Sequence, residues 1–565
     1  MKKLLALLLC MVMVVAVFAG CNNNAGTNAT NGTDATNGAV SDTLPDDITI
    51  TIGIPENALV EDYDTNAYTL WLEEQTGYDL EFVKFLPSPA DYKAKLSTAL
   101  VNGDELPDIL VGFQLNRSYY QDLGEDGYII DMKPFFEDKE GKAKVWWDRV
   151  NALDETTKEN ILANLYSDDG ESIWSFPIIE HSDFDVMDHQ MVINQEWLKA
   201  LNLEMPTDPD SLYEVLKAFK TRDPNGNGRA DEIPLLGTVD GLYGDPVTWI
   251  LNMFTYVNYE RNWSVDEEGQ LYTYFTSDEY REGLKFIRKL VDEGLLDMTS
   301  WGLSSDTQKS LLAPLDGTAT IGISGMHSGD SWPVNTDLIY QYTPMEYWGY
   351  ATINVNRLEW WTFITEDCEY PEAAWNLMML AASEEGGYWS RYGEKGVDWD
   401  WAPEGTKSFL GRDARIEVFV PDARGNGVSN WCWLYWGIAT DSENEATAVT
   451  ENATEWNKYR FNMMKTQFEN YYEAAARTPE NAVGALRFTE EESEEIATAK
   501  TNVSNVVTTA RSSFCTGKSS NGKYTNPNDD KQWEAYKQEI LDQGYEQWRE
   551  MAQVVYDDMY GKNAE

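Results

Sequence analysis

Histidine and basic residues are scarce in this sequence. Its 565 residues include 3 histidines, and 43 lysines and arginines stand against 96 aspartates and glutamates, which gives a formal net charge of −53 at pH 7. A surface with this much negative charge repels phosphate backbones and anionic lipids. We therefore expect no nucleic-acid partner and no electrostatic attachment to a membrane. His181, His189 and His327 each stand apart from the others. Their separation argues against a zinc site or a Ser-His-Asp triad.

Familiar catalytic motifs and paired cysteines are also absent. The sequence has no HExxH, no GxSxG and no P-loop. Beyond the N-terminal segment, Cys368, Cys432 and Cys515 are widely separated and form no CxxC pair, so we expect buried thiols rather than a disulfide framework. A glycosidase needs only two carboxylates, and with so many acidic residues a secreted glycoside hydrolase stays open as an alternative.

The first 47 residues predict export and anchoring. "MKKLLALLLCMVMVVAVFAGC" has two lysines, an apolar run and two small residues before Cys21. It resembles a bacterial lipoprotein signal, which predicts a signal peptide at 1–20 and lipidation of Cys21. An uncleaved transmembrane anchor is the alternative, although the run is shorter than the ~20 residues that span a bilayer. Residues 21–47 are polar and predict a disordered tether. We therefore expect a lipid-anchored protein on the extracellular face of the cytoplasmic membrane.

From residue 48 onward, strand-like and helix-like segments alternate. "ITITIGIPEN" predicts a strand, residues 65–76 a helix and "LEFVKFLP" a second strand. "ADYKAKLSTALVNGD" predicts a helix that ends at Gly103, and "LPDILVGF" predicts a third strand. This alternation predicts an α/β protein with a mainly parallel sheet, in which ligands bind at the carboxyl ends of the strands.

Two later segments predict amphipathic helices. In "PTDPDSLYEVLKAF" we expect Thr207 or Asp208 to cap the helix. In "TSDEYREGLKFIRKLVDEG" we expect Thr276 and Glu279 to form a capping pair and Gly294 to end the helix. Each segment repeats apolar residues with helical spacing, which predicts helices packed on a sheet.

Several motifs, in order, carry a family resemblance. "ALVNGDELPDIL", "IWSFPII", "VINQEWLKALNLEMPTDPDSLYEVLKAFKTRDPNGNGRADEIPL", "LKFIRKLVDEGLLD" and "EYPEAAWNLMMLAASEEG" succeed one another along the chain. Together they resemble the extracellular solute-binding proteins of ABC importers, family 1, the carbohydrate-type family. Nearly everything after the tether takes part in this resemblance.

The resemblance implies a two-lobed fold of the periplasmic-binding-protein type II class. Each lobe would be a mainly parallel sheet flanked by helices, with residues 48–178 and 349–390 in the first lobe and 179–348 and 391–565 in the second. The resemblance further implies a non-enzymatic, monomeric binding subunit that captures an oligosaccharide between the lobes and delivers it to the permease by hinge closure. A peptide-binding or sensory lipoprotein of the same fold is the alternative.

Aromatic residues make up 13% of the chain, and tryptophans recur in polar, loop-like contexts. Flat rings suit the apolar faces of sugars, although core packing is the alternative for each tryptophan. We expect the cleft to be lined by Trp174, Trp332, Trp360, Trp361 and Trp431. Matching the strand-end loops to the family adds Glu56, Asn57, Gln114, Asn116 and Arg117. The negative net charge favours a neutral oligosaccharide.

The stretch "DPNGNGRADEIP" has the spacing of an EF-hand-type calcium loop. Oxygen ligands are expected at positions one, three, five, seven and nine, which are Asp223, Asn225, Asn227, Arg229 (through its carbonyl) and Asp231. Position twelve is Pro234, so Glu232 must supply the remaining carboxylate, as the resemblance to the calcium-containing alginate-oligosaccharide-binding members implies. We expect a structural Ca²⁺ here, and a solvated DPNG turn is the alternative.

Overall fold

The computed structural model describes most of the chain after the tether. The described residues are 44–560, apart from 46, 58–59, 154–157, 159–160, 163, 168–169, 181–189, 240–243, 258–262, 315, 326–336, 347, 351–356, 409, 420–437, 440–446, 449–457, 460–461, 464, 467–468, 471–478, 484–485 and 487. The chain divides into two compact units, Met1–Pro45 and Asp46–Glu565. The predicted signal peptide, Cys21, Trp332, Trp431, Cys432 and all three histidines lie outside the described residues. A search of the described helices found none with the length and apolar character needed to cross a membrane.

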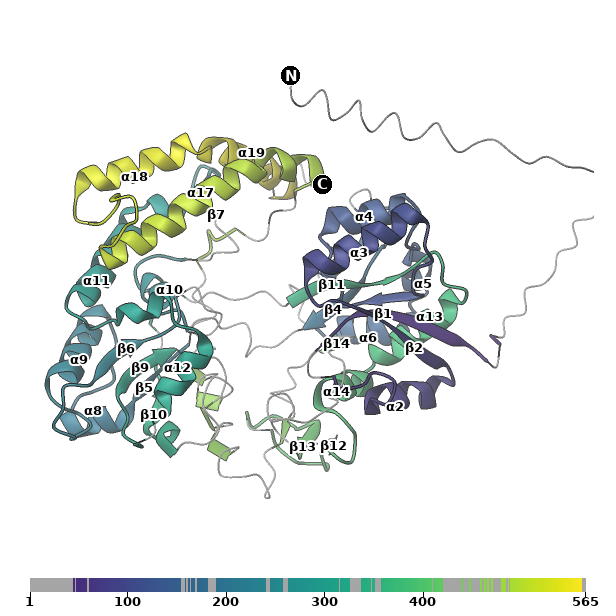
Figure 1. Ribbon diagram of the computed structural model, residues 1–565, viewed down its shortest axis with the longest axis horizontal. Helices are drawn as coiled ribbons and strands as arrows, with labels where there is room; N and C mark the ends of the chain where they lie inside the picture. The colour runs from purple at the N-terminus through teal and green to yellow at the C-terminus, as the bar shows by residue number, and fades with distance from the viewer. Residues whose placement is uncertain are drawn as a thin grey trace, which may run out of the picture. The chain divides into compact units, whose positions relative to one another are not determined.

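A six-stranded mixed sheet organises the first lobe (Figure 1). Its strands are β1 (Thr49–Pro55), β2 (Asp79–Phe85), β3 (Ile109–Val111), β4 (Phe176–Glu180), β11 (Arg357–Ile364) and β14 (Ile438–Ala439), in the order β14-β4-β11-β3-β1-β2. β1 runs parallel to β2 and β3, and β14 runs parallel to β4. β11 is antiparallel to both of its neighbours. The predicted parallel β1, β2 and β3 are confirmed.

Helices cover both faces of this sheet (Figure 1). They are α2 (Ala67–Thr76), α3 (Pro89–Asn102), α4 (Arg117–Glu125), α5 (Lys133–Glu137), α6 (Lys144–Asn151), α13 (Pro371–Ala381) and α14 (Glu384–Tyr392). Tyr92 and Leu96 of α3 are buried with Leu110 of β3 in one apolar cluster. α3 ends, as predicted, at Gly103, whose φ of 69° is readily adopted only by glycine.

A four-stranded sheet organises the second lobe. It comprises β5 (Met191–Asn194), β6 (Ile233–Leu236), β9 (Ile321–Gly325) and β10 (Tyr342–Pro344), in the order β10-β5-β9-β6. Only β6 and β9 are parallel, because β5 runs antiparallel to both β9 and β10. The prediction of a mainly parallel sheet is therefore wrong for this lobe. β5, which follows the first-lobe strand β4 in the chain, pairs antiparallel with both of its neighbours. The spacing of apolar residues does not encode the direction in which a strand pairs.

The helices of the second lobe carry the predicted apolar stripes. They are α8 (Gln195–Leu201), α9 (Pro209–Thr221), α10 (Pro246–Leu251), α11 (Asp278–Asp292) and α12 (Ser305–Leu312), with the short 3-10 helices η1 (Tyr274–Thr276), η2 (Met298–Trp301) and η4 (Asp337–Gln341). Asp208 caps α9 in a capping box, as one of the two expected alternatives. The cap of α11 is Ser277 rather than Thr276, because Thr276 belongs to η1.

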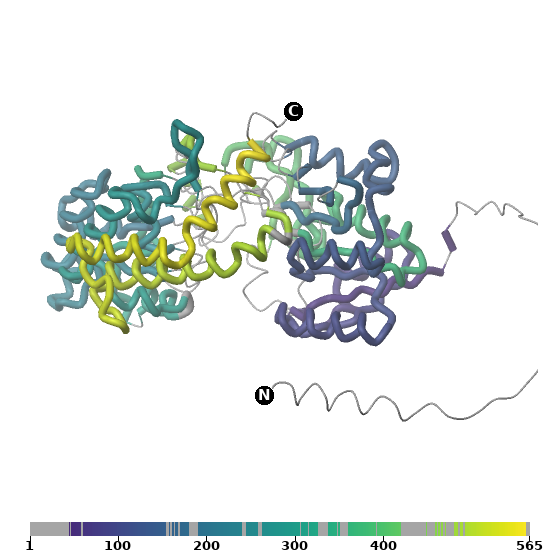
Figure 2. The backbone as a smooth tube through the Cα atoms, turned by 90° about the horizontal axis from the view of Figure 1, so that it is seen from above, coloured from purple at the N-terminus to yellow at the C-terminus, as the bar shows by residue number. Residues whose placement is uncertain are grey.

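The three C-terminal helices lie along the second lobe (Figure 2), and the first of them packs on α11. They are α17 (Glu490–Thr516), α18 (Asp530–Asp542) and α19 (Tyr545–Tyr560), and α19 also contacts the hairpin of β7 (Trp263–Val265) and β8 (Leu271–Thr273). Phe514, Trp533 and Trp548 share one apolar cluster with Leu284 and Ile287 of α11. The large buried rings make the helices part of the second-lobe core rather than a loose appendage.

A small third sheet joins β12 (Trp399–Trp401), β13 (Ile416–Val418) and β15 (Thr447–Ala448). Trp399 packs against Tyr388 of α14, with ring centroids 5.3 Å apart. The sequence placed residues 391–565 in the second lobe, but the structure pairs β14 with β4 and packs β12 against the first-lobe helix α14. Partners distant in sequence thus place these two strands beside first-lobe elements, and the lobe boundaries stay a prediction.

Two of the three cysteines in the body are described, and both are buried and free, as predicted. Burial raises the pKa of the Cys368 thiol and of the Cys515 thiol to about 12. At neutral pH both thiols are therefore protonated and unreactive.

Candidate functional site

Two loops with polar side chains leave the same edge of the first sheet. β1 ends at Pro55 and its parallel neighbour β3 ends at Val111, with Gly53 of β1 opposite Leu110 of β3. Glu56 and Asn57 follow β1, and Gln114, Asn116 and Arg117 follow β3. Because carboxyl ends of adjacent parallel strands meet at one edge, these five predicted ligand residues share one end of the sheet.

Each of the two loops combines exposed polar side chains with one that is half-buried. Glu56, Gln114 and Asn116 are exposed, whereas Asn57 and Arg117 are half-buried. The Asn116 amide donates to Ser118 Oγ at 3.0 Å, and the Glu56 N–H donates to the Phe85 carbonyl at 2.8 Å. Exposed polar side chains on backbone held by hydrogen bonds are suited to contact with sugar hydroxyls.

Arg117 is engaged within the protein. It is the first residue of α4, and its guanidinium donates to the carbonyls of Asn164 and Tyr166 at 3.1 and 2.5 Å. These bonds join the start of α4 to a segment 47 and 49 residues further along the chain. We infer that Arg117 chiefly stabilises this segment, and its predicted contact with ligand stays a prediction.

Replacing Arg117 by alanine is expected to lower the free energy of unfolding by about 1–3 kcal/mol, because two charge-assisted hydrogen bonds to backbone carbonyls are lost. Gln114→Ala is the matched control, since this exposed neighbour should change stability by less than about 0.5 kcal/mol. Urea unfolding of both variants measures the difference. Equal stability of the two would show that the Arg117 bonds contribute little.

The described tryptophans of the predicted set are half-buried and pack within the first lobe. A Cβ atom at Gly124 of α4 would lie 2.2 Å from the indole of Trp174, so the ring rests directly on the helix backbone. Trp174 and Trp360 pack against one apolar cluster, and the Trp361 carbonyl accepts the Phe113 N–H at 3.1 Å. Core packing thus explains much of the Trp174 surface. Whether these rings also contact ligand stays a prediction.

The second lobe presents an aromatic group that the sequence did not single out as a site. Trp348 meets Trp249 of α10 edge-on at 5.7 Å, and Tyr350 meets Tyr256 edge-on at 6.2 Å. Tyr350 is 38% exposed, and its N–H donates to the Asn252 carbonyl at 2.8 Å. The only sequence signal was the aromatic cluster "EYWGY", because the partners Trp249 and Tyr256 lie about 100 residues earlier in the chain.

The predicted calcium loop has the backbone geometry of an Asx-type cradle. Asp223 adopts a φ of 45°, and its carboxylate accepts the N–H groups of Asn227 and Gly228 at 3.1 and 3.0 Å. Asn225 Oδ1 accepts the Asn227 N–H at 3.0 Å, and Asn227 Oδ1 accepts the Arg229 N–H at 2.7 Å. The loop thus curls around side-chain oxygens, as the spacing predicted.

The acidic end of this loop lacks a positive partner for one carboxylate. Glu232 Oε1 is buried and accepts no hydrogen bond from any residue that the structure describes. Burial, followed by the charges of Asp231 and Asp223, raises the pKa of Glu232. The Asn227 amide donates to Asp231 at 3.1 Å, and the Arg229 side chain is exposed. Several ligand oxygens and one buried carboxylate oxygen without a described partner fit a hard divalent cation, although no group of three or more His, Cys, Asp or Glu in the described part of the chain is arranged as a metal site.

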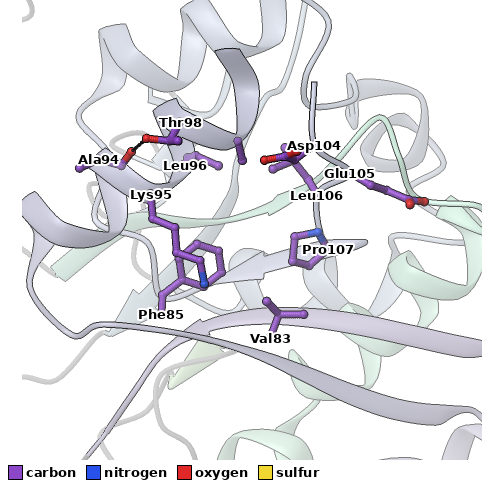
Figure 3. Close-up of a pocket in the computed structure, with 11 residues that line it drawn as sticks. Val83, Phe85, Ala94, Lys95, Leu96, Thr98, Asp104, Glu105, Leu106 and Pro107 are labelled. Carbon is purple, nitrogen blue, oxygen red and sulfur yellow. Dashed lines mark hydrogen bonds between the residues drawn. The ribbon is translucent and has the colours of Figure 1, made fainter. Parts of the chain in front are cut away.

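A separate pocket of about 540 Å³ lies between α3 and β2 (Figure 3). Val83, Phe85, Leu96, Leu106 and Pro107 supply most of its apolar lining. The Lys95 ammonium lies 4.0 Å from the centre of the Phe85 ring and donates to the Lys84 carbonyl at 3.1 Å. The residues that line this pocket include none of the predicted ligand residues, so it is distinct from the predicted site.

Solved structures define the class of fold. The chain matches a human-milk-oligosaccharide-binding, ABC-transporter-associated solute-binding protein of Bifidobacterium longum infantis with a TM-score of 0.69 and 19% identity, over 91% of this chain and 99% of that one. It matches an EF-hand mutant of Streptococcus pneumoniae FusA in complex with fructo-nystose with a TM-score of 0.66 and 20% identity, over 90% of this chain and 99% of that one. It also matches the alginate-binding protein AlgQ2 without calcium ion with a TM-score of 0.60 and 18% identity, over 90% of this chain and 98% of that one. The fold is the two-lobed α/β fold of solute-binding proteins.

Sequence comparison identifies the relatives. The chain is 31% identical over 231 residues to the fructooligosaccharide ABC transporter substrate-binding protein FusA of Streptococcus pneumoniae, and 28% identical over 226 residues to lipoprotein LipO of Bacillus subtilis. Each match spans 40% of this chain and 40% of the relative. No family model matches the chain. These relatives confirm the predicted resemblance to the carbohydrate-type solute-binding proteins of ABC importers.

Proposed function

We propose that this chain is the substrate-binding subunit of an ABC importer and that it captures an oligosaccharide for delivery to the permease, without catalysis. The observation that carries the proposal is its sequence similarity to a fructooligosaccharide-binding protein of such a transporter. The geometry agrees, because exposed polar side chains follow the neighbouring strands β1 and β3, where α/β sheets bind ligands. Binding proteins of this kind act by affinity and closure, and need no reactive group.

The chemistry of the loops suits sugar hydroxyls. Carboxylate and amide groups of Glu56, Gln114 and Asn116 can accept hydrogen bonds from sugar hydroxyls, and the amides can also donate to them. Half-buried aromatic rings can cover the apolar face of a pyranose or furanose ring. A ligand that contacts both lobes favours the closed form by its higher affinity for that form. The permease would then receive the ligand from the closed protein.

The same proposal includes attachment outside the cytoplasmic membrane. Residues 1–20 would be removed on export, and Cys21 would carry the lipid. The polar segment 21–47 would tether a monomeric body to the cell surface, where the permease lies. One relative is itself a lipoprotein, which supports the anchor.

A structural calcium ion completes the proposal. The oxygen atoms that would hold it belong to Asp223, Asn225, Asn227, Asp231 and Glu232, together with the Arg229 carbonyl. A bound divalent cation supplies positive charge that offsets the repulsion among three carboxylates. The buried Glu232 oxygen without a hydrogen bond supports this proposal.

Titration calorimetry with a glycan panel tests the function. We expect a neutral glycan such as fructo-nystose or a neutral milk oligosaccharide to bind, and the bound sugar to be recovered unchanged. Heat from extended peptides but from no sugar would favour the peptide-binding alternative instead. New reducing ends in the recovered sugar would show a glycoside hydrolase.

A further inference from the structure

Two buried tyrosines lie beneath the loops that carry the proposed ligand residues. Tyr63 follows β1, and Tyr92 belongs to α3. Their side chains are 2% and 1% exposed, so neither presents a surface to a ligand. The sequence identified neither as part of a site.

Each tyrosine hydroxyl holds the backbone of one loop. Tyr63 Oη accepts the Asn57 N–H at 2.9 Å, and Tyr92 Oη accepts the Gln114 N–H at 2.9 Å. Burial raises the pKa of both hydroxyls, so both stay neutral at physiological pH. An N–H just beyond a strand has left the sheet ladder, and burial without a partner would cost free energy. The same arrangement thus occurs at two neighbouring strand ends.

Packing of the rings sets where the hydroxyls lie. The Tyr63 ring lies 5.2 Å from Phe82 of β2, and the Tyr92 ring lies 5.1 Å from Phe113, the residue before Gln114. Phe113 also meets Phe85 edge-on at 4.9 Å. The two tyrosines therefore pack in separate aromatic groups, one on each face of β2, and in each group the tyrosine hydroxyl holds the backbone of one loop by a hydrogen bond.

We propose that Tyr63 and Tyr92 are positioning residues for ligand binding, because their hydroxyls hold the backbone of the two ligand loops in the binding conformation before ligand arrives. The inference rests on the proposed function, since it takes both loops as ligand contacts. Preorganised loops lose less conformational entropy on binding, which raises affinity without any added contact. Loss of either hydroxyl should therefore weaken binding although neither tyrosine touches the ligand.

Tyr63→Phe and Tyr92→Phe in the full mature chain test the proposal, with Tyr536→Phe as the matched control. Tyr536 is equally buried, at 1% exposed, and its hydroxyl donates to the Phe275 carbonyl at 3.1 Å, between α18 and η1. All three variants lose one buried hydroxyl that bonds to backbone. Similar small falls in the unfolding midpoint are expected in all three.

Amide exchange and affinity then separate positioning from mere packing. In the loop variants we expect exchange of the Asn57 or Gln114 amide to quicken by roughly threefold to tenfold, and binding of fructo-nystose, or of the panel glycan that binds the unaltered protein, to weaken by a similar factor. Tyr536→Phe should change neither quantity. Unchanged exchange, or unchanged affinity in both loop variants, would overturn the proposal. If the unaltered protein binds no glycan, the proposed function fails, and the exchange measurement alone decides whether the hydroxyls hold the loops.

Discussion

Chelation of calcium is expected to lower the thermal unfolding midpoint of the protein by several degrees, and calcium, but not magnesium, should restore it. A ligand at 1,000 times its dissociation constant stabilises the folded state by about 4 kcal/mol. Calcium is favoured because the loop offers several oxygen atoms on a flexible backbone, whereas magnesium requires a tighter octahedron. Differential scanning calorimetry in EDTA, and after addition of each metal, measures this.

Asp223→Asn provides the variant for this experiment. The asparagine side chain keeps one oxygen that can accept either the Asn227 or the Gly228 N–H group, and it removes one negative charge from the loop. Asp266→Asn is the control, because Asp266 accepts the Glu268 and Gln270 N–H groups in a similar turn outside the loop. We expect calcium to stabilise the control and to stabilise Asp223→Asn far less. A chelator-insensitive midpoint in the unaltered protein would contradict the calcium proposal.

Gly325→Ala is expected to destabilise the protein by about 3 kcal/mol or more, since overpacking against fixed atoms allows little relief. A Cβ atom at Gly325 would lie 2.3 Å from Gly244 Cα and 2.4 Å from Gly244 O. These are backbone atoms, so no side-chain rotation can remove the clash. Gly325 ends β9, and Gly244 directly precedes Asp245, the cap of α10. Relief would require the start of α10 to move away from the sheet.

Gly302→Ala is the matched control for this substitution. Gly302 has a negative φ of −150°, and a Cβ atom there would meet nothing within 4 Å. We expect its free energy of unfolding to stay within about 0.5 kcal/mol of the unaltered protein. Urea titration of both variants decides the matter. A Gly325→Ala protein as stable as Gly302→Ala would mean that α10 shifts at little cost.

Local patterns determined much of what the sequence predicted correctly. The apolar stripe of α9 and the glycine that ends α3 depend on residues within one or two helical turns. The curl of the 223–232 loop follows from side chains that bond backbone two to five residues away. The predicted N-cap of α11 was wrong by one residue, because Thr276 belongs to η1 and Ser277 caps the helix. Such features are visible in sequence because their interactions are short in sequence.

The sequence by itself determined the α/β class, the strands β1, β2 and β3 as local elements, and the main amphipathic helices. Only the tertiary structure decided the antiparallel pairing of β5, the place of β14 beside β4, and the engagement of Arg117 with carbonyls 47 and 49 residues away. It also brought Tyr63 and Tyr92 beneath the two loops. The reason is physical: periodicity reports which face of an element is apolar, whereas the partner of that face is selected by packing and hydrogen bonding across the whole chain.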